Sequence, residues 1–349
     1  MREPVRVMVL GTGQMGSGIA RLVLDKPELE LVGVYAKRAE RHGMDVGRAI
    51  GLECDLGVPV NGDLVELLES ARPAVAIQAT CSLLTDAREE IMTLLQHGVR
   101  IISIAEEMAY PAARSVPVAA EIERLARDND AAVVGTGINP GFVMDLLIIV
   151  LTGVCMDVQS IMAERVNDLS PYGATVLASQ GVGLAAQEFR ERVASGQVSG
   201  HHGFSQSIHM IAQALGWNID RIEQSREPIV SKVRRETPLI TVLPGQTAGC
   251  LHCATGYRDG VPAITLRHPQ QIHPHLEDVQ TGDSIEISGT PNIHLAGTPE
   301  IAGGKGTIAL AVNMIPRVMD AAPGLYCMAD LPIPAALASD PQRDACAHV

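Results

Sequence analysis

The sequence predicts an α/β protein with two units: a doubly wound parallel sheet at the N-terminus, followed by an α+β domain with a mixed sheet. The first half alternates short apolar runs with helical segments, which is the pattern of βαβ units. A glycine-rich turn directly follows the first apolar run. The second half has several strand-like runs with few helices between them, and this favours a mixed or antiparallel sheet with one covered face.

The chain is organised around residues 6–21, RVMVLGTGQMGSGIAR, in which an apolar run leads into G-x-G-x-x-G spacing. In the Rossmann turn that binds a dinucleotide, the first glycine permits the tight turn and the second admits the pyrophosphate. The third lets the helix pack closely on the strand. The alternative is an ordinary strand–turn–helix, but the position after an N-terminal strand favours the dinucleotide site. The residues predicted to contact the dinucleotide are Gly11, Gly13, Gln14, Met15 and Gly16.

The end of the second strand bears on the choice of coenzyme. The strand is predicted over Glu30–Tyr35, and no acid follows it that would hold the ribose 2′-hydroxyl of NAD. Lys37 and Arg38 stand there instead, and their charges suit a 2′-phosphate. The sequence therefore favours NADP, with NAD possible; the alternative is a solvated basic turn.

Further strands are predicted over Ala74–Ala79 and Arg100–Ala105, with a helix over Asp86–His97 between them. Small residues at a strand's carboxyl end suit the crevice where ligands bind, so Ala79 and Thr80 are predicted to contact the coenzyme.

Two adjacent carboxylates, Glu106 and Glu107, follow the second of these strands. They are either a general base beside the nicotinamide or an ordinary acidic helix start. The next strand, Ala131–Thr136, leads into a turn-rich loop that contains Ile138 and Asn139.

The second half is predicted to contain the paired histidines His201 and His202 before a helix, Gln206–Leu215, that Ser205 caps. Another helical stretch spans Ser179–Ser195 and is interrupted by glycines. A last long helix, predicted over Thr307–Met319, contains Asn313. The main strands are predicted over Val158–Val166, Ile229–Val233, Thr247–Tyr257, Ala263–Arg267 and Ser284–Gly289.

Composition narrows the function classes. The net charge of −13 argues against nucleic acid or an anionic membrane as the main partner. No apolar run predicts a membrane span, and the polar start predicts no secretory signal, so a cytoplasmic protein is expected. Seven scattered cysteines predict reduced thiols, and the single C-x-x-C pair, Cys250 and Cys253, has no partner pair for zinc. No metal site is predicted.

Several short motifs, taken in order, carry a family resemblance: GTGQMG, IAEEMAYP, GINPGF, HHGF, DSIEISGTPNI, GGKGTIALAVNMIPRV and PGLYCMADLP. Together they resemble the 2,4-diaminopentanoate dehydrogenase family, which includes the native amine dehydrogenases and is related in fold to dihydrodipicolinate reductases. The resemblance runs from about residue 5 to residue 333. It implies NAD(P)-dependent oxidative deamination of an amine to a ketone or aldehyde with release of ammonia, reversible as reductive amination.

The resemblance also implies roles for individual residues. Glu106 matches the family's acid/base position, with Glu107 as the alternative. Ile138 matches a pocket position, and one of His201 and His202 inherits another. The family pattern further implies a C-terminal domain that forms a homodimer and an active site between the two domains. The acid that family members often have before the threonine of this segment is absent from GGKGT here.

The sequence is compatible with two substrates, 2,4-diaminopentanoate and a small alkyl amine. An amino-acid substrate needs a cation for its carboxylate, and the available bases in the second half are Arg165, Lys232, Arg234 and Arg235. Two other functions are weighed: an imine or carbonyl reductase on the same scaffold, and a non-catalytic NADP-binding sensor.

The predicted domain boundaries follow from these assignments. Residues 1–145 form the NAD(P)-binding Rossmann domain, and residues 146–305 form the substrate and dimerisation domain. Residues 306–332 form a C-terminal helix that packs back on the Rossmann domain, and residues 333–349 form a loosely ordered tail.

Overall fold

The computed structural model describes residues 3–339 and residue 346. The chain divides into two compact units: unit 1 comprises Met1–Phe142 and Ala302–Val349, and unit 2 comprises Val143–Ile301. The C-terminal segment thus belongs to the same unit as the N-terminal half. None of the helices in the described part of the chain has the length and apolar character needed to cross a bilayer.

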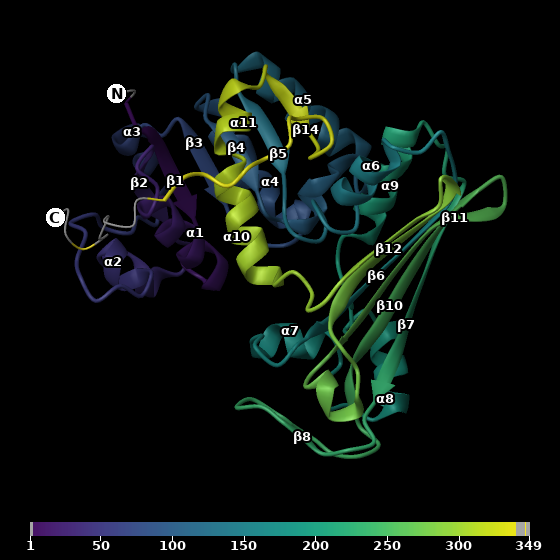
Figure 1. The fold of residues 1–349 in the computed structure, drawn as a ribbon. Coiled ribbons are helices and arrows are strands. Elements are labelled where there is room, and N and C mark those ends of the chain that lie inside the picture. The colour runs from purple at the N-terminus through teal and green to yellow at the C-terminus, as the bar shows by residue number, and fades with distance from the viewer. Residues whose placement is uncertain (1–2, 340–345, 347–349) are drawn as a thin grey trace. The chain divides into compact units, whose positions relative to one another are not determined.

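Unit 1 is built on a six-stranded sheet in the order β14-β5-β4-β3-β1-β2 (Figure 1). Every pairing in it is parallel. β3 and β5 are buried along their whole length, and β1 and β4 are buried after their first one or two residues, as their apolar sequence predicts. The predicted doubly wound parallel sheet is therefore confirmed. Its strands are β1 (Val5–Leu10), β2 (Leu29–Tyr35), β3 (Val75–Gln78), β4 (Arg100–Ser103), β5 (Ala132–Gly135) and β14 (Gly324–Tyr326).

Side chains cap some of the helices of unit 1 at their N-termini. Asp63 accepts hydrogen bonds from the first turn of α3, and Ser115 does so for α5. The predicted last helix is in fact two helices, because the chain turns at Met314 and Pro316 stands in the first turn of the second one. The helices are α1 (Gln14–Leu24), α2 (Val46–Ala49), α3 (Leu64–Ala71), α4 (Leu84–Gln96), α5 (Val116–Asp128), α10 (Gly303–Asn313) and α11 (Ile315–Asp320).

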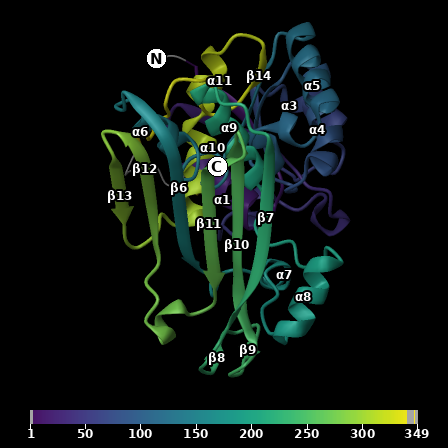
Figure 2. The same ribbon diagram turned by 90° about the vertical axis from the view of Figure 1, so that its right-hand side faces the viewer.

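Unit 2 contains a second six-stranded sheet, whose strands lie side by side in Figure 2 in the order β13-β12-β6-β11-β10-β7. The β11–β6 pairing is parallel and the others are antiparallel, which confirms the predicted mixed sheet. Its strands are β6 (Asp157–Asp168), β7 (Arg221–Val230), β10 (Thr247–Arg258), β11 (Val261–Gln271), β12 (Gly282–Thr290) and β13 (Ile293–Gly297). Its helices are α6 (Leu146–Thr152), α7 (Ala174–Ser179), α8 (Ala186–Ala194) and α9 (Phe204–Leu215).

One local prediction for unit 2 was confirmed in part and another was wrong. The stretch predicted as one interrupted helix forms the end of α7 and all of α8, because Gly181 and Gly183 adopt positive φ angles that a helix cannot contain. Ser205 does not cap α9, whose N-cap is Gly203, and its hydroxyl lies near His209 instead.

Two of the cysteines form a disulfide, and the C-x-x-C pair lies within one strand. Cys54 and Cys346 form a disulfide, so the expectation that all seven thiols are reduced was wrong. Cys250 and Cys253 both lie on β10, where residues three apart point to opposite faces of the sheet. Cys250 is buried and Cys253 is half-buried, so the C-x-x-C pair does not place two thiols side by side.

The described part of the predicted tail has specific contacts in unit 1, although it forms no helix or strand. Lys26 donates hydrogen bonds to the Leu337 carbonyl and to the Ser339 hydroxyl, at 2.9 and 2.7 Å. The Leu337 N–H donates to the side chain of Asn313 at 3.0 Å. Residues 340–345 and 347–349 of the predicted tail lie outside the described residues.

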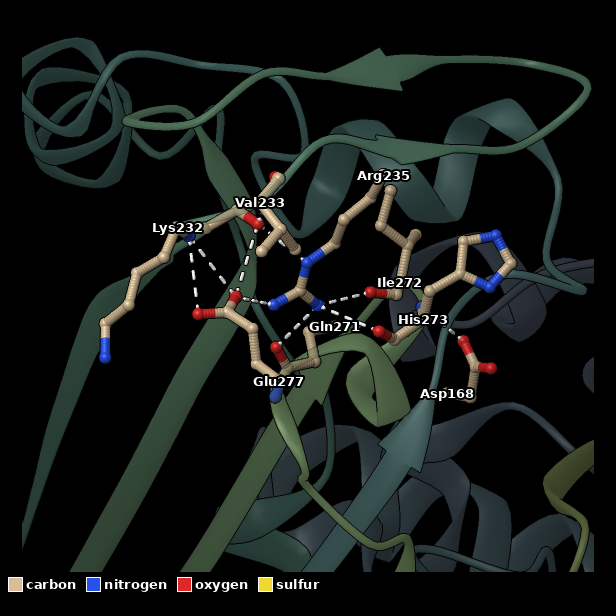
Figure 3. Close-up of polar contacts among 9 residues, drawn as sticks. Asp168, Lys232, Val233, Arg235, Gln271, Ile272, His273 and Glu277 are labelled. Atoms are coloured by element: carbon tan, nitrogen blue, oxygen red, sulfur yellow. Dashed lines mark hydrogen bonds and ion pairs between the residues drawn. The ribbon is translucent and has the colours of Figure 1, made fainter.

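A short hairpin of unit 2, β8 (Arg235–Glu236) with β9 (Thr241–Val242), is anchored by one buried guanidinium (Figure 3). Arg235 is 1% exposed and donates to the Ser231 hydroxyl at 2.7 Å and to the Gln271 side chain at 2.8 Å. It also donates to two backbone carbonyls and pairs with Glu277. Burial alone would raise the pKa of the Glu277 carboxyl group. Hydrogen bonds from Arg235 and from the Lys232 N–H stabilise its charged form and hold this pKa below its ordinary value.

We predict that Arg235→Met lowers the free energy of unfolding of unit 2 by roughly 3–5 kcal/mol, because it leaves a carboxylate and several carbonyls without their partner. Arg234→Met is the matched control, since Arg234 is exposed and, in the described part of the chain, its ion pair is with Glu236 on the surface, a contact worth at most about 1 kcal/mol. Trp217, the one tryptophan of the chain, lies in unit 2 and reports its urea unfolding by fluorescence. Equal effects of the two substitutions would contradict the role given to Arg235.

Candidate active site

The glycine turn of unit 1 has the geometry that a dinucleotide requires. Gly11 has a φ of +118°, and a Cβ added there would stand 2.7 Å from the Ala79 carbonyl oxygen. A Cβ at Gly16 would stand 2.1 Å from the Gly11 carbonyl, so only glycine lets α1 approach β1 this closely. A Cβ at Gly13 would meet nothing within 4 Å, so the space beside this N-cap of α1 is open. The turn therefore fits a pyrophosphate at a helix N-terminus.

The two basic residues after β2 differ in their contacts. Lys37 Nζ lies 3.1 Å from Oε1 of Glu90, a carboxylate on α4 that is 4% exposed. Burial alone would lower the pKa of Lys37, but the Glu90 carboxylate raises it above the ordinary value. Arg38 is exposed and has no ion pair among the described residues. Of the two cations predicted for a 2′-phosphate, one thus already has an acidic partner.

Side chains at the carboxyl ends of β3 and β4 form a buried polar network. Thr80 donates to Oε2 of Glu90, and the Gln78 amide donates to the same oxygen at 3.2 Å. The Ser103 hydroxyl donates to the side-chain amide oxygen of Gln78 at 2.6 Å and accepts a hydrogen bond from the Ala105 N–H at 3.2 Å. The network runs from Lys37 to the residue directly before Glu106.

The structure separates the two adjacent glutamates. Glu107 accepts the Leu84 N–H in the first turn of α4 at 2.8 Å and pairs with Arg114 at 3.3 Å. Glu106 has no basic partner among the described residues. Burial, with the Glu107 charge adding to it, raises the pKa of Glu106 to about 7, against hydrogen bonds from its own backbone and from Ser82. A carboxyl group that titrates near neutrality can both take and return a proton there.

The loop after β5 meets α10 within unit 1. The Ile138 N–H donates to the Thr307 hydroxyl at 3.1 Å, and the Ile138 side chain would lie 2.8 Å from a Cβ added at Gly306. Ile138 is 7% exposed, and Asn139 is half-buried. Asn313, predicted to contact the coenzyme, accepts the Leu337 N–H described above. Their coenzyme and substrate roles stay predictions.

In unit 2 the segment before α9 closes over imidazoles of the mixed sheet. The His201 N–H donates to Nδ1 of His252 at 3.0 Å, and the His201 ring lies edge-on to His268, with centroids 5.0 Å apart. Burial is the first cause that lowers the pKa of all three rings, to about 3 for His252 and well below the ordinary value for the others. The cluster is therefore neutral at physiological pH. His201 contacts the other rings edge-on, and His202, which is half-buried, lies near enough for its charge to lower the pKa of His201 and His252.

A buried guanidinium lies on the same face of the sheet. Alternation along β6 places Ile161, Ala163, Arg165 and Asn167 on the buried face. Arg165 is 2% exposed; it pairs with Asp283 and donates to the Ile301 carbonyl. Its charge is, after burial, the largest cause that lowers the pKa of His268.

Several polar atoms near this arginine are buried without a hydrogen-bond partner among the described residues. Gln270 is paired with Asn167 in the β11–β6 register, so both lie beside Arg165 and His268 on neighbouring strands. Because a buried polar atom without a partner is costly, such a group of atoms indicates a place for a polar ligand. The atoms are Asn167 Oδ1, Gln270 Nε2 and His201 Nε2.

Sequence reasoning named Arg165 only as one of four available bases and did not find Asn167, His252, His268 or Glu90. The alternation of β6 was a usable signal, since Arg165 and Asn167 occur at positions that the strand buries. Nothing local marked Glu90, because a carboxylate on an amphipathic helix ordinarily faces water. Lys232 and Arg234 are exposed and Arg235 anchors the hairpin, whereas Arg165 is buried and its charge lowers the pKa of His201 and His268.

Comparisons with known proteins agree with this division of the chain. Residues 142–347 match the model of the 2,4-diaminopentanoate dehydrogenase C-terminal domain, and residues 5–104 match that of the dihydrodipicolinate reductase N-terminus. A 2,4-diaminopentanoate dehydrogenase of Acetoanaerobium sticklandii is 43% identical over 340 residues, which cover 97% of this chain and 96% of that protein.

Solved structures give the same result. An amine dehydrogenase from Mycobacterium smegmatis superposes with a TM-score of 0.84 at 27% identity, covering 97% of this chain and 98% of that one. A dihydrodipicolinate reductase from Paenisporosarcina shares the fold at 14% identity, with a TM-score of 0.53 over 94% of this chain and 99% of that one. The family resemblance and the fold predicted from the motifs are confirmed, as is an NAD(P)-binding Rossmann domain.

We predict that Gly13→Val weakens NADPH binding at least tenfold while leaving thermal stability nearly unchanged, because the side chain would fill the space of the pyrophosphate and nothing else. Gly173→Val is the matched control: Gly173 is also an N-cap with extended backbone and nothing within 4 Å of an added Cβ. Fluorescence titration with NADPH measures both. Unchanged NADPH affinity in Gly13→Val would contradict the assignment of the turn.

Proposed function

Because this chain belongs to the 2,4-diaminopentanoate dehydrogenase family, we propose that, among amine substrates, it acts on 2,4-diaminopentanoate rather than on a simple alkyl amine. The reaction is the reversible oxidative deamination of an amine to a ketone with release of ammonia. The observation that carries the choice is the buried polar group around Arg165 in unit 2.

The chemistry of that group favours an amino-acid substrate. A guanidinium with amide and imidazole groups beside it suits a carboxylate and an α-amino group. An alkyl amine would leave Asn167 Oδ1, Gln270 Nε2 and His201 Nε2 buried against hydrocarbon, at a cost of about 1–3 kcal/mol for each polar group. Asp283 already balances the charge of Arg165, so the site accepts a zwitterion without a large excess of positive charge.

Glu106 is the proposed acid/base. The substrate ammonium must lose a proton before its carbon can release a hydride, and the Glu106 carboxylate takes that proton. Once Glu106 has released that proton to solvent, the same carboxylate removes a proton from the water that attacks the iminium and returns it to the nitrogen that leaves as ammonia. The nicotinamide coenzyme, when bound, accepts the hydride; Gly11, Gly13 and Gly16 shape its site. Glu107 is assigned to holding the start of α4, because both of its oxygens already have partners.

NADP is the proposed preferred coenzyme, supported by Lys37 and Arg38 and by the absence of an acid after β2. The homodimer implied by the family resemblance stays a prediction. What supports it is the face of the mixed sheet that carries Met162, Glu164 and Arg267, whose side chains are half-buried or exposed.

The decisive experiment follows NADPH oxidation by the purified protein with excess ammonium. The carbonyl substrates are 2-amino-4-oxopentanoate and, as its counterpart without the amino-acid group, 2-pentanone. We expect ammonium-dependent oxidation with the amino acid and at least 100-fold lower kcat/KM with the plain ketone. A comparable kcat/KM for both would overturn the substrate proposal. Oxidation that does not need ammonium would instead indicate a carbonyl reductase.

We predict that Glu106→Gln lowers kcat for amine oxidation by at least about 100-fold, in the range typical of losing a general base, while NADPH binding is retained. In the unaltered protein, kcat/KM rises with pH through an apparent pKa of about 7, because the base works only when ionised. In Glu107→Gln, kcat/KM should still rise with pH near 7, since the Glu107 carboxylate holds the start of α4. If kcat/KM of Glu106→Gln also rose with pH near 7, the assignment of Glu106 as the base would be contradicted.

We predict that Asn167→Leu raises KM for 2-amino-4-oxopentanoate about tenfold and changes thermal stability little, because it removes both a buried Oδ1 without a partner among the described residues and the hydrogen bond of the Asn167 side chain with Tyr172. Glu164→Gln, on the opposite face of β6, is the control and should leave KM unchanged. Steady-state kinetics with saturating ammonium measure both variants. A loss of stability without a change in KM would mean that Asn167 has a structural role only.

A further inference from the structure

Glu90 is a buried carboxylate for which the proposed reaction has no use. It projects from the middle of α4, is 4% exposed, and reaches the carboxyl ends of β2 and β3. Oε1 lies 3.1 Å from Lys37 Nζ, and Oε2 accepts hydrogen bonds from Thr80 and Gln78. Burying a carboxylate is costly unless it is paired and hydrogen-bonded, and here both of its oxygens are engaged.

Each of these partners stands where the Rossmann arrangement places the adenosine half of the coenzyme. Lys37 follows β2, whose end meets the ribose, and Thr80 follows β3 at the crevice. Glu90 therefore puts a fixed negative charge behind the one lysine that the sequence offers to a 2′-phosphate. The pair Lys37–Glu90 has no net charge, and Arg38, which is exposed and has no ion pair among the described residues, supplies the net positive charge at this edge.

We propose that Glu90 is a positioning residue that sets the coenzyme preference: it holds the Lys37 ammonium and offsets its charge, so that Arg38 is the cation that favours NADP. The proposal rests on the proposed coenzyme site. The residue that controls the choice between NADP and NAD would thus lie on α4, and not in the turn that follows β2. The chain accordingly prefers NADP only moderately and retains affinity for NAD.

Substitutions of Glu90 and of Lys37 should change the coenzyme preference in opposite directions. Glu90→Gln keeps an oxygen to accept from Thr80 but removes the negative charge, so the affinity for NADP+ rises relative to NAD+. We expect the ratio Kd(NAD+)/Kd(NADP+) to increase about tenfold. Lys37→Met leaves the Glu90 charge near the 2′-phosphate, and the same ratio should fall at least tenfold. The double variant restores neutrality, and its ratio should lie within about threefold of the unaltered protein.

Glu89→Gln is the matched control. Glu89 is the neighbouring residue on α4 and carries the same charge, but it is exposed, and solvent and salt screen its charge. Its substitution should change the ratio less than twofold. Raising the salt concentration should reduce the effect of Glu90→Gln, because the effect comes from charge rather than from packing.

The measurement is direct titration of each variant with NADP+ and with NAD+, followed by protein fluorescence, with thermal unfolding to confirm folding. Binding needs no turnover, so it separates the two proposals: if the unaltered protein binds neither coenzyme, the proposed function fails. If it binds both, and Glu90→Gln and Lys37→Met leave the ratio within twofold, Glu90 is only structural and this inference is overturned. If Glu90→Gln does not fold, the Lys37→Met variant, whose substituted side chain is half-exposed, decides alone.

Discussion

The parallel pairing of β1 with both β2 and β3 is the constraint on which the rest of unit 1 depends. Parallel strands bring their carboxyl ends to one edge of the sheet, so segments far apart in sequence meet there. The glycine turn, Lys37, Thr80 and Glu106 all lie at this edge because each directly follows a strand. The close approach of α1 to β1 at Gly16 leaves the space beside Gly13 open for a phosphate. The polar network from Lys37 to Ser103 crosses the same edge and links the coenzyme side to the carboxylate segment.

Neighbouring glutamates show how tertiary contacts, rather than residue type, decide chemistry. Glu106 and Glu107 are adjacent in the chain, yet Glu107 is held by a helix start and an arginine while Glu106 has no cation beside it in the described part of the chain. The unpaired one therefore has a pKa near 7. Glu90 is a third case: it is buried more deeply, and its charge is used to hold a lysine. Three carboxylates of one unit thus serve as a structural link, as the proposed acid/base and as the proposed coenzyme selector.

Unit 2 concentrates its polar chemistry on the buried face of an otherwise ordinary mixed sheet. Along β6 the buried side chains change from Ile161 and Ala163 to Arg165 and Asn167, and β11 changes in step from Leu266 to His268 and Gln270. Because β6 and β11 are paired, the polar side chains of the two strands lie side by side. Burial keeps the imidazoles neutral, so the guanidinium is the charged group on this face, beside the amides of the proposed substrate site.

The sequence by itself determined the parallel sheet, the glycine turn, the mixed sheet and the family, because these depend on local periodicity and on motifs whose spacing is visible along the chain. It also named the Glu106–Glu107 pair and the His201–His202 pair, each as two candidates. Only the tertiary structure distinguished the members of each pair, found the partner of Lys37 in Glu90, and paired Cys54 with Cys346. The physical reason is that burial and pairing are properties of contacts between segments distant in sequence. Such contacts determine which carboxylate titrates near neutrality and which arginine is buried, and no local pattern encodes them.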